Sequence, residues 1–179
     1  MAGRADQTLL DELAAGKEEA FGKLYDLYGQ RLFKAALGMV GRREDAEDAV
    51  QDVFLGLARA SRTLAHVENL NAYLFASLRR TAMRRAARHK AELPLEDVAA
   101  PAGEGTRAGQ ADQADVSERL GRALQSLPVE QREVLALKIA GGLTFEEVAE
   151  ALDERVNTVA SRYRYALEKL RAALLVVAP

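Results

Sequence analysis

The chain has 179 residues, 49% of them hydrophobic, so it can bury the core of one domain or of two small ones. It contains no cysteine, which excludes disulfides and thiolate metal sites. The net charge of −2 argues against a general polyanion binder, and the apolar runs are too short to cross a bilayer, so we expect a cytoplasmic protein without membrane insertion.

Apolar side chains recur at helical spacing in two segments of the first sixty residues, and the chain shows no alternating strand pattern of useful length. We therefore predict an all-α fold. The stripe of the first segment is Phe21, Leu24, Leu27 or Tyr28, Leu32, Ala35 and Met39. The stripe of the second segment is Ala46, Ala49 or Val50, Val53 and Leu57.

The second of these helices carries acidic side chains on its outer face. Asp45, Asp48 and Asp52 are spaced so that they form a ridge there. Grouped carboxylates can bind a metal or act in acid–base catalysis, but neither of the two histidines of the chain lies near them. We favour a docking surface for a basic partner, with simple solubility as the alternative.

A third helix is predicted from about residue 69 to residue 90, in a basic part of the chain. Residues 61–91 carry seven basic side chains and one acidic side chain. Arg80, Arg84 and Arg88 are spaced by four, with Arg85 beside them, so one face carries a stripe of guanidinium groups. Such a stripe can follow phosphates, and a plain solvated face is the alternative. The side chains expected to face the core are Leu70, Leu74, Leu78 and Ala82.

Two aromatic residues, Tyr73 and Phe75, lie upstream of this stripe. Their rings could stack on unpaired bases. The alternative is that they belong to the core, and for Phe75 it is the favoured interpretation.

Residues 91–116 show no sustained apolar period. They are acidic and include two prolines and three glycines. This composition is typical of a flexible linker, here between two helical domains.

After this segment the sequence predicts a helix-turn-helix. Pro128 can open a helix that the glycine pair at residues 141–142 stops. Thr144 and Glu147 form a capping box for the next helix. A short break at residues 153–155 and a longer helix complete the outline.

The longer helix has an apolar face and a polar face. Short polar residues near a helix start, followed by arginines, suit a helix in the major groove, where they can read base edges and hold phosphates. A solvated face is the alternative, but the capped helix and tight turn before it favour DNA binding. The residues expected to face the core are Val159, Tyr163, Ala166, Leu170 and Leu174. Those expected to face outward are Asn157, Thr158, Ser161, Arg162, Arg164 and Tyr165.

Three segments, in this order and with a linker between them, resemble the extracytoplasmic-function (ECF) group of bacterial RNA polymerase sigma factors. "AEDAVQDVFLGL" is similar to the segment that binds the polymerase clamp. "ENLNAYLFASLRRTAMRRAARHK" is similar to the helix that melts and reads the −10 element. "LQSLPVEQREVLALKIAGGLTFEEVAEAL", with "NTVASRYRYALEKLR" after it, resembles the domain that reads the −35 element.

The resemblance implies a transcription initiation factor whose partners are core RNA polymerase and promoter DNA, and it leaves an anti-sigma factor open as a further partner. Its two helical domains would be residues 1–91 and 118–179, joined by a flexible acidic linker at residues 92–117. No phosphate-cradling glycine loop, nucleophile constellation or metal-ligand cluster is evident. We therefore expect no enzyme activity, small-molecule substrate, cofactor or metal.

The resemblance also implies residue roles. The loop from His66 to Asn71 would take a flipped −10 base, and nearby arginines would hold the DNA backbone. The polymerase-docking residues would be Asp48, Gln51, Asp52 and Phe54. The −10 residues would be His66, Asn69, Asn71, Tyr73, Arg80, Arg84, Arg85 and Arg88. The −35 residues would be Asn157, Thr158, Ser161, Arg162, Arg164 and Tyr165.

The chain departs from the family pattern at several positions. Tyr73 stands where the family often has Trp and Arg80 where it often has Asn, which bears on the −10 preference. In the turn, Asp153, Glu154 and Arg155 replace Gly, an apolar residue, and Ser or Pro. Two alternatives stay open: a stand-alone helix-turn-helix regulator, and a sigma-like decoy that titrates an anti-sigma factor.

Overall fold

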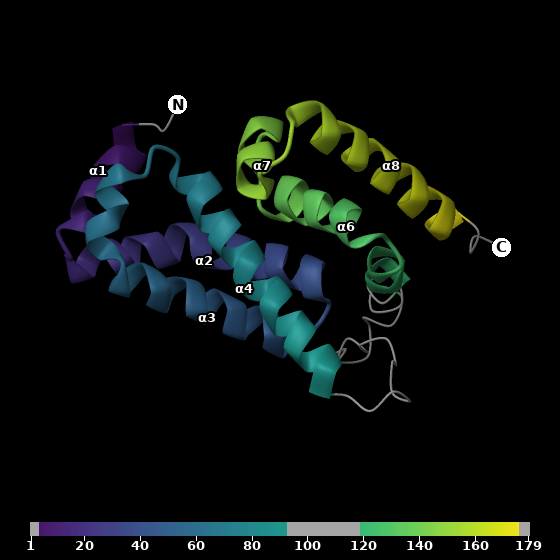
Figure 1. The fold of residues 1–179 in the computed structure, drawn as a ribbon, viewed down its shortest axis with the longest axis horizontal. Helices are drawn as coiled ribbons and strands as arrows, with labels where there is room; N and C mark the ends of the chain where they lie inside the picture. The colour runs from purple at the N-terminus through teal and green to yellow at the C-terminus, as the bar shows by residue number, and fades with distance from the viewer. Residues whose placement is uncertain (1–3, 93–118, 176–179) are drawn as a thin grey trace, which may run out of the picture.

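The computed structural model describes residues 4–92 and 119–175, and every regular element within these two ranges is helical (Figure 1). The predicted all-α class is therefore confirmed. None of the helices in these ranges is both long and apolar enough to span a membrane. The expected linker, apart from Glu92, lies outside the described residues.

The N-terminal unit, residues 4–92, is built from four α-helices and one short 3₁₀ helix. They are α1 (Arg4–Ala14), α2 (Glu18–Val40), α3 (Arg43–Arg59), η1 (Ser61–His66) and α4 (Leu70–Glu92). The helices α2, α3 and α4 pack against one another, and α1 packs against η1. The predicted stripe of α2 is buried from Leu24 to Met39, and Phe21 is half-buried against the core. Tyr28 and not Leu27 completes the stripe, because Leu27 is 60% exposed. The sequence patterns did not reveal α1 or η1.

The start and the buried face of α4 follow from its sequence. Asn69 precedes the helix, and its side-chain oxygen accepts a hydrogen bond from the Ala72 backbone N–H at 3.1 Å. The predicted inward stripe from Leu70 to Ala82 is buried. Phe75 is fully buried as well, which confirms that its ring belongs to the core and is not free to stack on a base.

The C-terminal unit, residues 119–175, contains the predicted helix-turn-helix. Residues 119–125 are helical and are followed by α6 (Val129–Leu135), its π-helical continuation η2 (Ala136–Ala140), α7 (Phe145–Leu152) and α8 (Val156–Leu175). The capping box is confirmed: Glu147 N–H donates to the Thr144 hydroxyl at 3.1 Å, and Thr144 N–H donates to the Glu147 carboxylate at 2.8 Å. Asp153 has a φ of 54°, so the left-handed turn residue before α8 is an aspartate.

The two units are in contact. In Figure 1 the C-terminal unit, green to yellow, lies along α2 and α4 of the N-terminal unit. The helix α2 packs against η2, and α4 packs against α7. One apolar core runs through both units and includes Leu74 and Leu78 on one side and Leu137 and Val148 on the other. This contact brings the loop before α4 next to the helix-turn-helix.

Candidate nucleic-acid and protein interfaces

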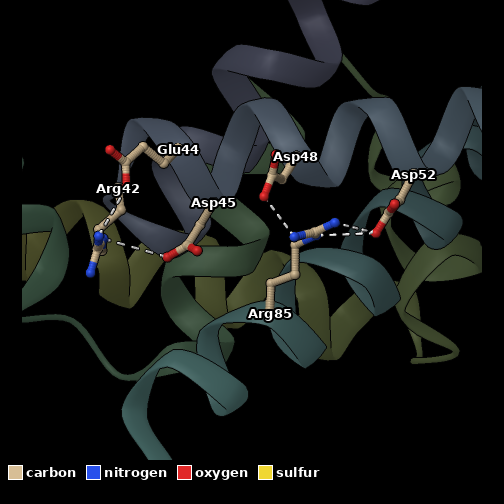
Figure 2. Close-up of polar contacts among 6 residues, drawn as sticks. All are labelled: Arg42, Glu44, Asp45, Asp48, Asp52 and Arg85. Carbon is tan, nitrogen blue, oxygen red and sulfur yellow. Dashed lines mark hydrogen bonds and ion pairs between the residues drawn. The ribbon is translucent and has the colours of Figure 1, made fainter. Parts of the chain in front are cut away.

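The acidic ridge of α3 is joined to α4 by one arginine (Figure 2). The Arg85 guanidinium lies 2.7 Å from a carboxylate oxygen of Asp48 and 2.7 Å from one of Asp52. Asp45 faces a different cation, Arg42, at 3.7 Å. No group of three His, Asp or Glu residues within the described ranges is arranged to hold a metal. The ridge is therefore partly neutralised from within the fold.

An apolar margin accompanies this ridge. The ring of Phe54 on α3 lies 5.2 Å from the ring of Tyr25 on α2, centroid to centroid. Tyr25 is 60% exposed, and Leu55, next to Phe54, is exposed too. Gln51 is also on the surface. Tyr25 and Leu55 were missed by the sequence patterns, although each is a large apolar residue off the buried stripe of its helix.

The basic stripe of α4 divides into free and paired arginines. Arg80, Arg84 and Arg88 are exposed, and Arg80 donates to the Ser77 hydroxyl at 3.0 Å. Arg84 and Arg88 form no ion pair with any residue in the described part of the chain. Arg85 is held by the ridge of α3. The freely exposed part of the stripe is therefore the row spaced by four.

The loop before α4 is engaged by the helix-turn-helix. The Asn71 amide donates to the Glu147 carboxylate at 2.9 Å, and the Asn69 amide donates to Glu150 at 3.1 Å. Both glutamates belong to α7. His66 is exposed at the end of η1, whereas Tyr73 is half-buried against the core. Asn69, which precedes α4, and Asn71, which lies in its first turn, therefore already have partners within the chain.

Two further cations cross between the units, and sequence patterns predicted neither contact. Arg79 of α4 lies 2.9 Å from Glu133 of α6, whose side chain is 4% exposed. Arg31 of α2 donates through Nε to the Gly141 carbonyl at 2.9 Å and also contacts the Asn71 side-chain oxygen at 3.4 Å.

The guanidinium of Arg31 lies among aromatic rings. Its centre is 5.2 Å from the Tyr28 ring centroid and 5.5 Å from that of Phe75. Burial raises the pKa of the Tyr28 hydroxyl, and the charge of Asp6 adds to this increase.

The outward face of α8 is polar, as the sequence predicts. Asn157, Ser161, Arg164 and Tyr165 are exposed, while Thr158 and Arg162 are half-buried. Along this face the Ser161 hydroxyl donates to the Asn157 carbonyl at 2.9 Å, and the Arg164 guanidinium lies 5.0 Å from the Tyr165 ring centroid.

Two side chains of α8 depart from what the pattern alone shows. Arg162 pairs with Glu154 of the preceding turn at 2.9 Å. Leu174, expected to face the core, is 42% exposed, so that expectation is wrong. The apolar stripe ends one turn earlier because α8 extends past the helices that cover it.

Comparison with known proteins matches both units. The family model described as "Sigma-70 region 2" matches residues 24–92, and the one described as "Sigma-70, region 4" matches residues 117–170. The chain is 30% identical over 173 residues to the ECF RNA polymerase sigma factor SigM of Mycobacterium tuberculosis, covering 96% of this chain and 85% of that protein. It is 29% identical to SigK of Mycobacterium ulcerans, covering 96% of each chain.

Two solved structures are also similar. CnrH in complex with the cytosolic domain of CnrY matches with a TM-score of 0.73 and 26% identity, over 97% of this chain and 99% of that one. The sigma factor RpoE of Bartonella quintana, in complex with the anti-sigma factor NepR, matches with a TM-score of 0.66 and 25% identity, over 88% of this chain and 98% of that one.

Proposed function

The chain belongs to the ECF group of RNA polymerase sigma factors, and on that premise we propose how its surfaces carry out promoter-specific initiation. As a sigma factor it is no enzyme: it binds core RNA polymerase and brings it to promoter DNA. The observation that carries this function is the match of both sigma-70 regions, in order, on one chain.

The polymerase-docking surface is proposed to be the outer face of α3. Asp48, Gln51 and Asp52 supply its polar part. Phe54 and the neighbouring ring of Tyr25, tilted by 53° against it, supply an apolar margin. Mixed surfaces of this kind, with an aromatic anchor and a charged rim, are typical of protein–protein interfaces.

The −10 surface is proposed to be the loop of residues 66–71 together with the exposed face of α4. Asparagine amides can pair with base edges. Tyr73 would support the loop by packing, because its ring is half-buried against the core. The exposed arginine row of Arg80, Arg84 and Arg88 would hold backbone phosphates.

The −35 surface is proposed to be the outward face of α8. A recognition helix contacts base edges with its N-terminal residues, as Asn157, Thr158 and Ser161 would do here. Arg162, Arg164 and Tyr165 follow one turn later and would contact the backbone or the groove wall. Residues 1–91 and 118–179 would then act as the two domains, with residues 92–117 as the connection.

Transcription with purified components tests this assignment against its two alternatives. The chain should co-purify with core polymerase and should yield run-off transcripts, starting with the promoter of its own gene, that core polymerase alone does not make. A stand-alone regulator would bind duplex DNA without polymerase, and a decoy would support neither binding nor transcription. Footprinting of the polymerase complex would then locate the −10 and −35 contacts.

We further propose that the protein acts in the cytoplasm, where its polymerase works, and gathers on the nucleoid when bound to it. Both similar solved structures are complexes, one of them with a named anti-sigma factor. An anti-sigma protein is therefore proposed as a third partner, and pull-down from the source cell with the intact chain would test for it.

A further inference from the structure

Two carboxylates of the proposed docking surface are held by a side chain of another helix. The Arg85 guanidinium on α4 donates through Nη1 to Oδ2 of Asp48 at 2.7 Å. It donates through Nε and Nη2 to Oδ2 of Asp52, at 3.1 and 2.7 Å (Figure 2). Hydrogen bonds between charged groups are about twice as strong as neutral ones. Arg85 therefore fixes the positions of both carboxylates, which lie one turn apart on α3.

The other carboxylates of the ridge have cations from α3 itself or from the residue before it. Arg42 lies 3.2 Å from Glu44 and 3.7 Å from Asp45, and Arg43 lies 2.7 Å from Glu47. The partners are at most four positions apart, so these pairs do not tie α3 to another helix. Exposed pairs of this kind also contribute little to stability. Among the described carboxylates of the ridge, only the pair described above is oriented by a second helix.

Arg85 lies on a different side of α4 from the free arginine row. Successive residues of an α-helix are separated by about 100°, whereas residues four apart share a face. Arg84 therefore shares its face with Arg88, and Arg85 shares its face with Thr81, which is 8% exposed. The side chain of Arg85 is accordingly only 28% exposed. The free row and Arg85 thus face different surroundings.

The surroundings of Arg85 favour carboxylates over phosphate. Three of its N–H groups are already donated, and a phosphate that took them would leave Asp48 and Asp52 without their cation. The same phosphate would approach two carboxylates at short range, and like charges at such distances repel. Arg85, which the family resemblance placed among the −10 residues, is therefore better explained as part of the docking surface.

Arg85 holds each carboxylate through one oxygen and leaves the other oxygen for a partner. Both carboxylates use Oδ2, and no hydrogen bond among the described residues involves Oδ1 of either. The side chains of Asp48 and Asp52 remain 53% and 38% exposed. Two carboxylates with one guanidinium leave a net charge of −1. The cluster therefore matches one further cation, such as a lysine or arginine side chain of a partner.

We propose that Arg85 is a positioning residue for polymerase docking: it holds Asp48 and Asp52 so that their free oxygens receive a basic side chain of core polymerase, and it does not contact the DNA backbone. This inference rests on the proposed docking role of α3. A side chain that is already ordered does not lose conformational freedom when a partner binds, and this loss otherwise opposes association. Arg85 therefore favours docking through the two carboxylates that it orients.

Affinity for core polymerase and the salt dependence of DNA binding separate this role from a DNA contact. Arg85→Ala in the intact chain should weaken core binding by about fivefold to a hundredfold, the effect expected when two side chains must be ordered on docking. At saturating core polymerase the same variant should leave the slope of log affinity against log salt on promoter duplex unchanged, because no phosphate contact is lost.

Two single substitutions are the matched controls. Arg84→Ala, at the adjacent position, should give the reverse result: unchanged core binding and a salt slope smaller by about 0.9. Lys34→Ala removes an exposed cation outside both surfaces and should change neither quantity. Each variant is assayed under conditions in which its urea unfolding curve shows it to be folded.

A double-mutant cycle tests whether Arg85 acts through the carboxylates. In a chain with Asp48→Asn and Asp52→Asn, adding Arg85→Ala should change core affinity by less than about twofold, because the groups that it orients are no longer charged. Arg85→Lys in the wild-type background should retain part of the affinity, since one ammonium group lacks the planar fork that holds both carboxylates.

The results that would overturn the inference are specific. Equal or tighter core binding by Arg85→Ala would exclude a positioning role. A salt slope reduced by about 0.9 in Arg85→Ala would return Arg85 to the DNA-backbone contacts. An undiminished effect of Arg85→Ala in the chain with both asparagines would assign that effect to helix packing alone. If the wild-type chain neither binds core polymerase nor supports transcription, the proposed sigma activity is refuted, and the docking surface with it.

Discussion

Arg85 of α4 donates two hydrogen bonds to Asp52 of α3, at 2.7 and 3.1 Å. A third guanidinium nitrogen donates to Asp48 at 2.7 Å. The arginine thus ties the proposed DNA-backbone helix to the proposed polymerase-docking helix. Its first effect is on the packing of these two helices, and any contact of Arg85 with DNA would compete with this pairing.

Replacing Arg85 with Ala should lower the free energy of unfolding by about 0.5–1 kcal/mol, because the pairs are partly exposed and screened by solvent. Urea denaturation of the intact chain measures this change. Arg84→Ala is the control on the adjacent residue, which is exposed and forms no ion pair in the described part of the chain, so its effect should stay within about 0.5 kcal/mol. Equal losses of unfolding free energy in the two variants would contradict a stabilising role for the ion pairs of Arg85 between α3 and α4.

Reversing the charge of the free arginine row should stop promoter melting. Arg84→Glu with Arg88→Glu should abolish open-complex formation while leaving affinity for core polymerase unchanged, since these exposed side chains form no ion pair with α3. Permanganate reactivity of melted thymines and a polymerase-binding assay measure the two effects. Lys34→Glu with Arg59→Glu makes the same charge change at exposed positions outside the stripe. If polymerase binding is lost with the Arg84 and Arg88 changes, the assigned roles are wrong.

Removing one phosphate contact from α8 should be visible in the salt dependence of binding. Arg164→Ala should reduce the slope of log affinity against log salt by about 0.9 for the polymerase complex on promoter duplex. Lys169→Ala, further along the same helix and exposed, should leave the slope unchanged. An unchanged slope for Arg164→Ala would mean that this arginine faces water in the complex.

Glu154 should restrain Arg162, because the two side chains are 2.9 Å apart at the start of α8. Glu154→Ala frees this guanidinium for phosphate and should steepen the salt slope by about 0.9. Glu168→Ala removes an exposed carboxylate further along the helix and serves as the charge-matched control. If both variants change the slope equally, the effect is one of net charge and not of the Glu154–Arg162 pair.

Alkaline stability should depend on Tyr28. Burial raises its pKa in the folded chain above the ordinary value of 10.0, so the folded state binds the phenolic proton more tightly than the unfolded state does. The contribution of this proton binding to the free energy of unfolding is fully present below pH 10. It is lost as the pH rises through the folded-state pKa of Tyr28. The free energy of unfolding of Tyr28→Phe, measured in urea, should fall less steeply with pH than that of the wild type between about pH 9 and 11. Parallel curves for the two proteins would contradict this.

The elements of the fold could be predicted largely because their signals are local. The capping box of Thr144 and Glu147 lies within four residues, and the buried stripe of α4 repeats every turn. The exposed face of α8 could be predicted on the same grounds. The prediction that Leu174 is buried was wrong because burial depends on whether another helix reaches that turn. Sequence periodicity does not contain this information.

The partners of charged residues could not be predicted, because they come from distant parts of the chain. Arg85 and Asp52 are 33 positions apart, Arg79 and Glu133 are 54 apart, and Asn71 and Glu147 are 76 apart. A basic stripe looks uniform in sequence, yet packing assigns Arg79 and Arg85 to internal partners and leaves the row spaced by four exposed. Only the placement of α3 and α6 against α4 distinguishes these arginines.

The pairing of Arg79 with Glu133 also specifies which surfaces meet. The Glu133 side chain is 4% exposed, and a carboxylate buried to this extent is stable only where the facing surface supplies a cation. Hydrophobic contact is non-directional, so this ion pair favours one alignment of the two units over neighbouring ones.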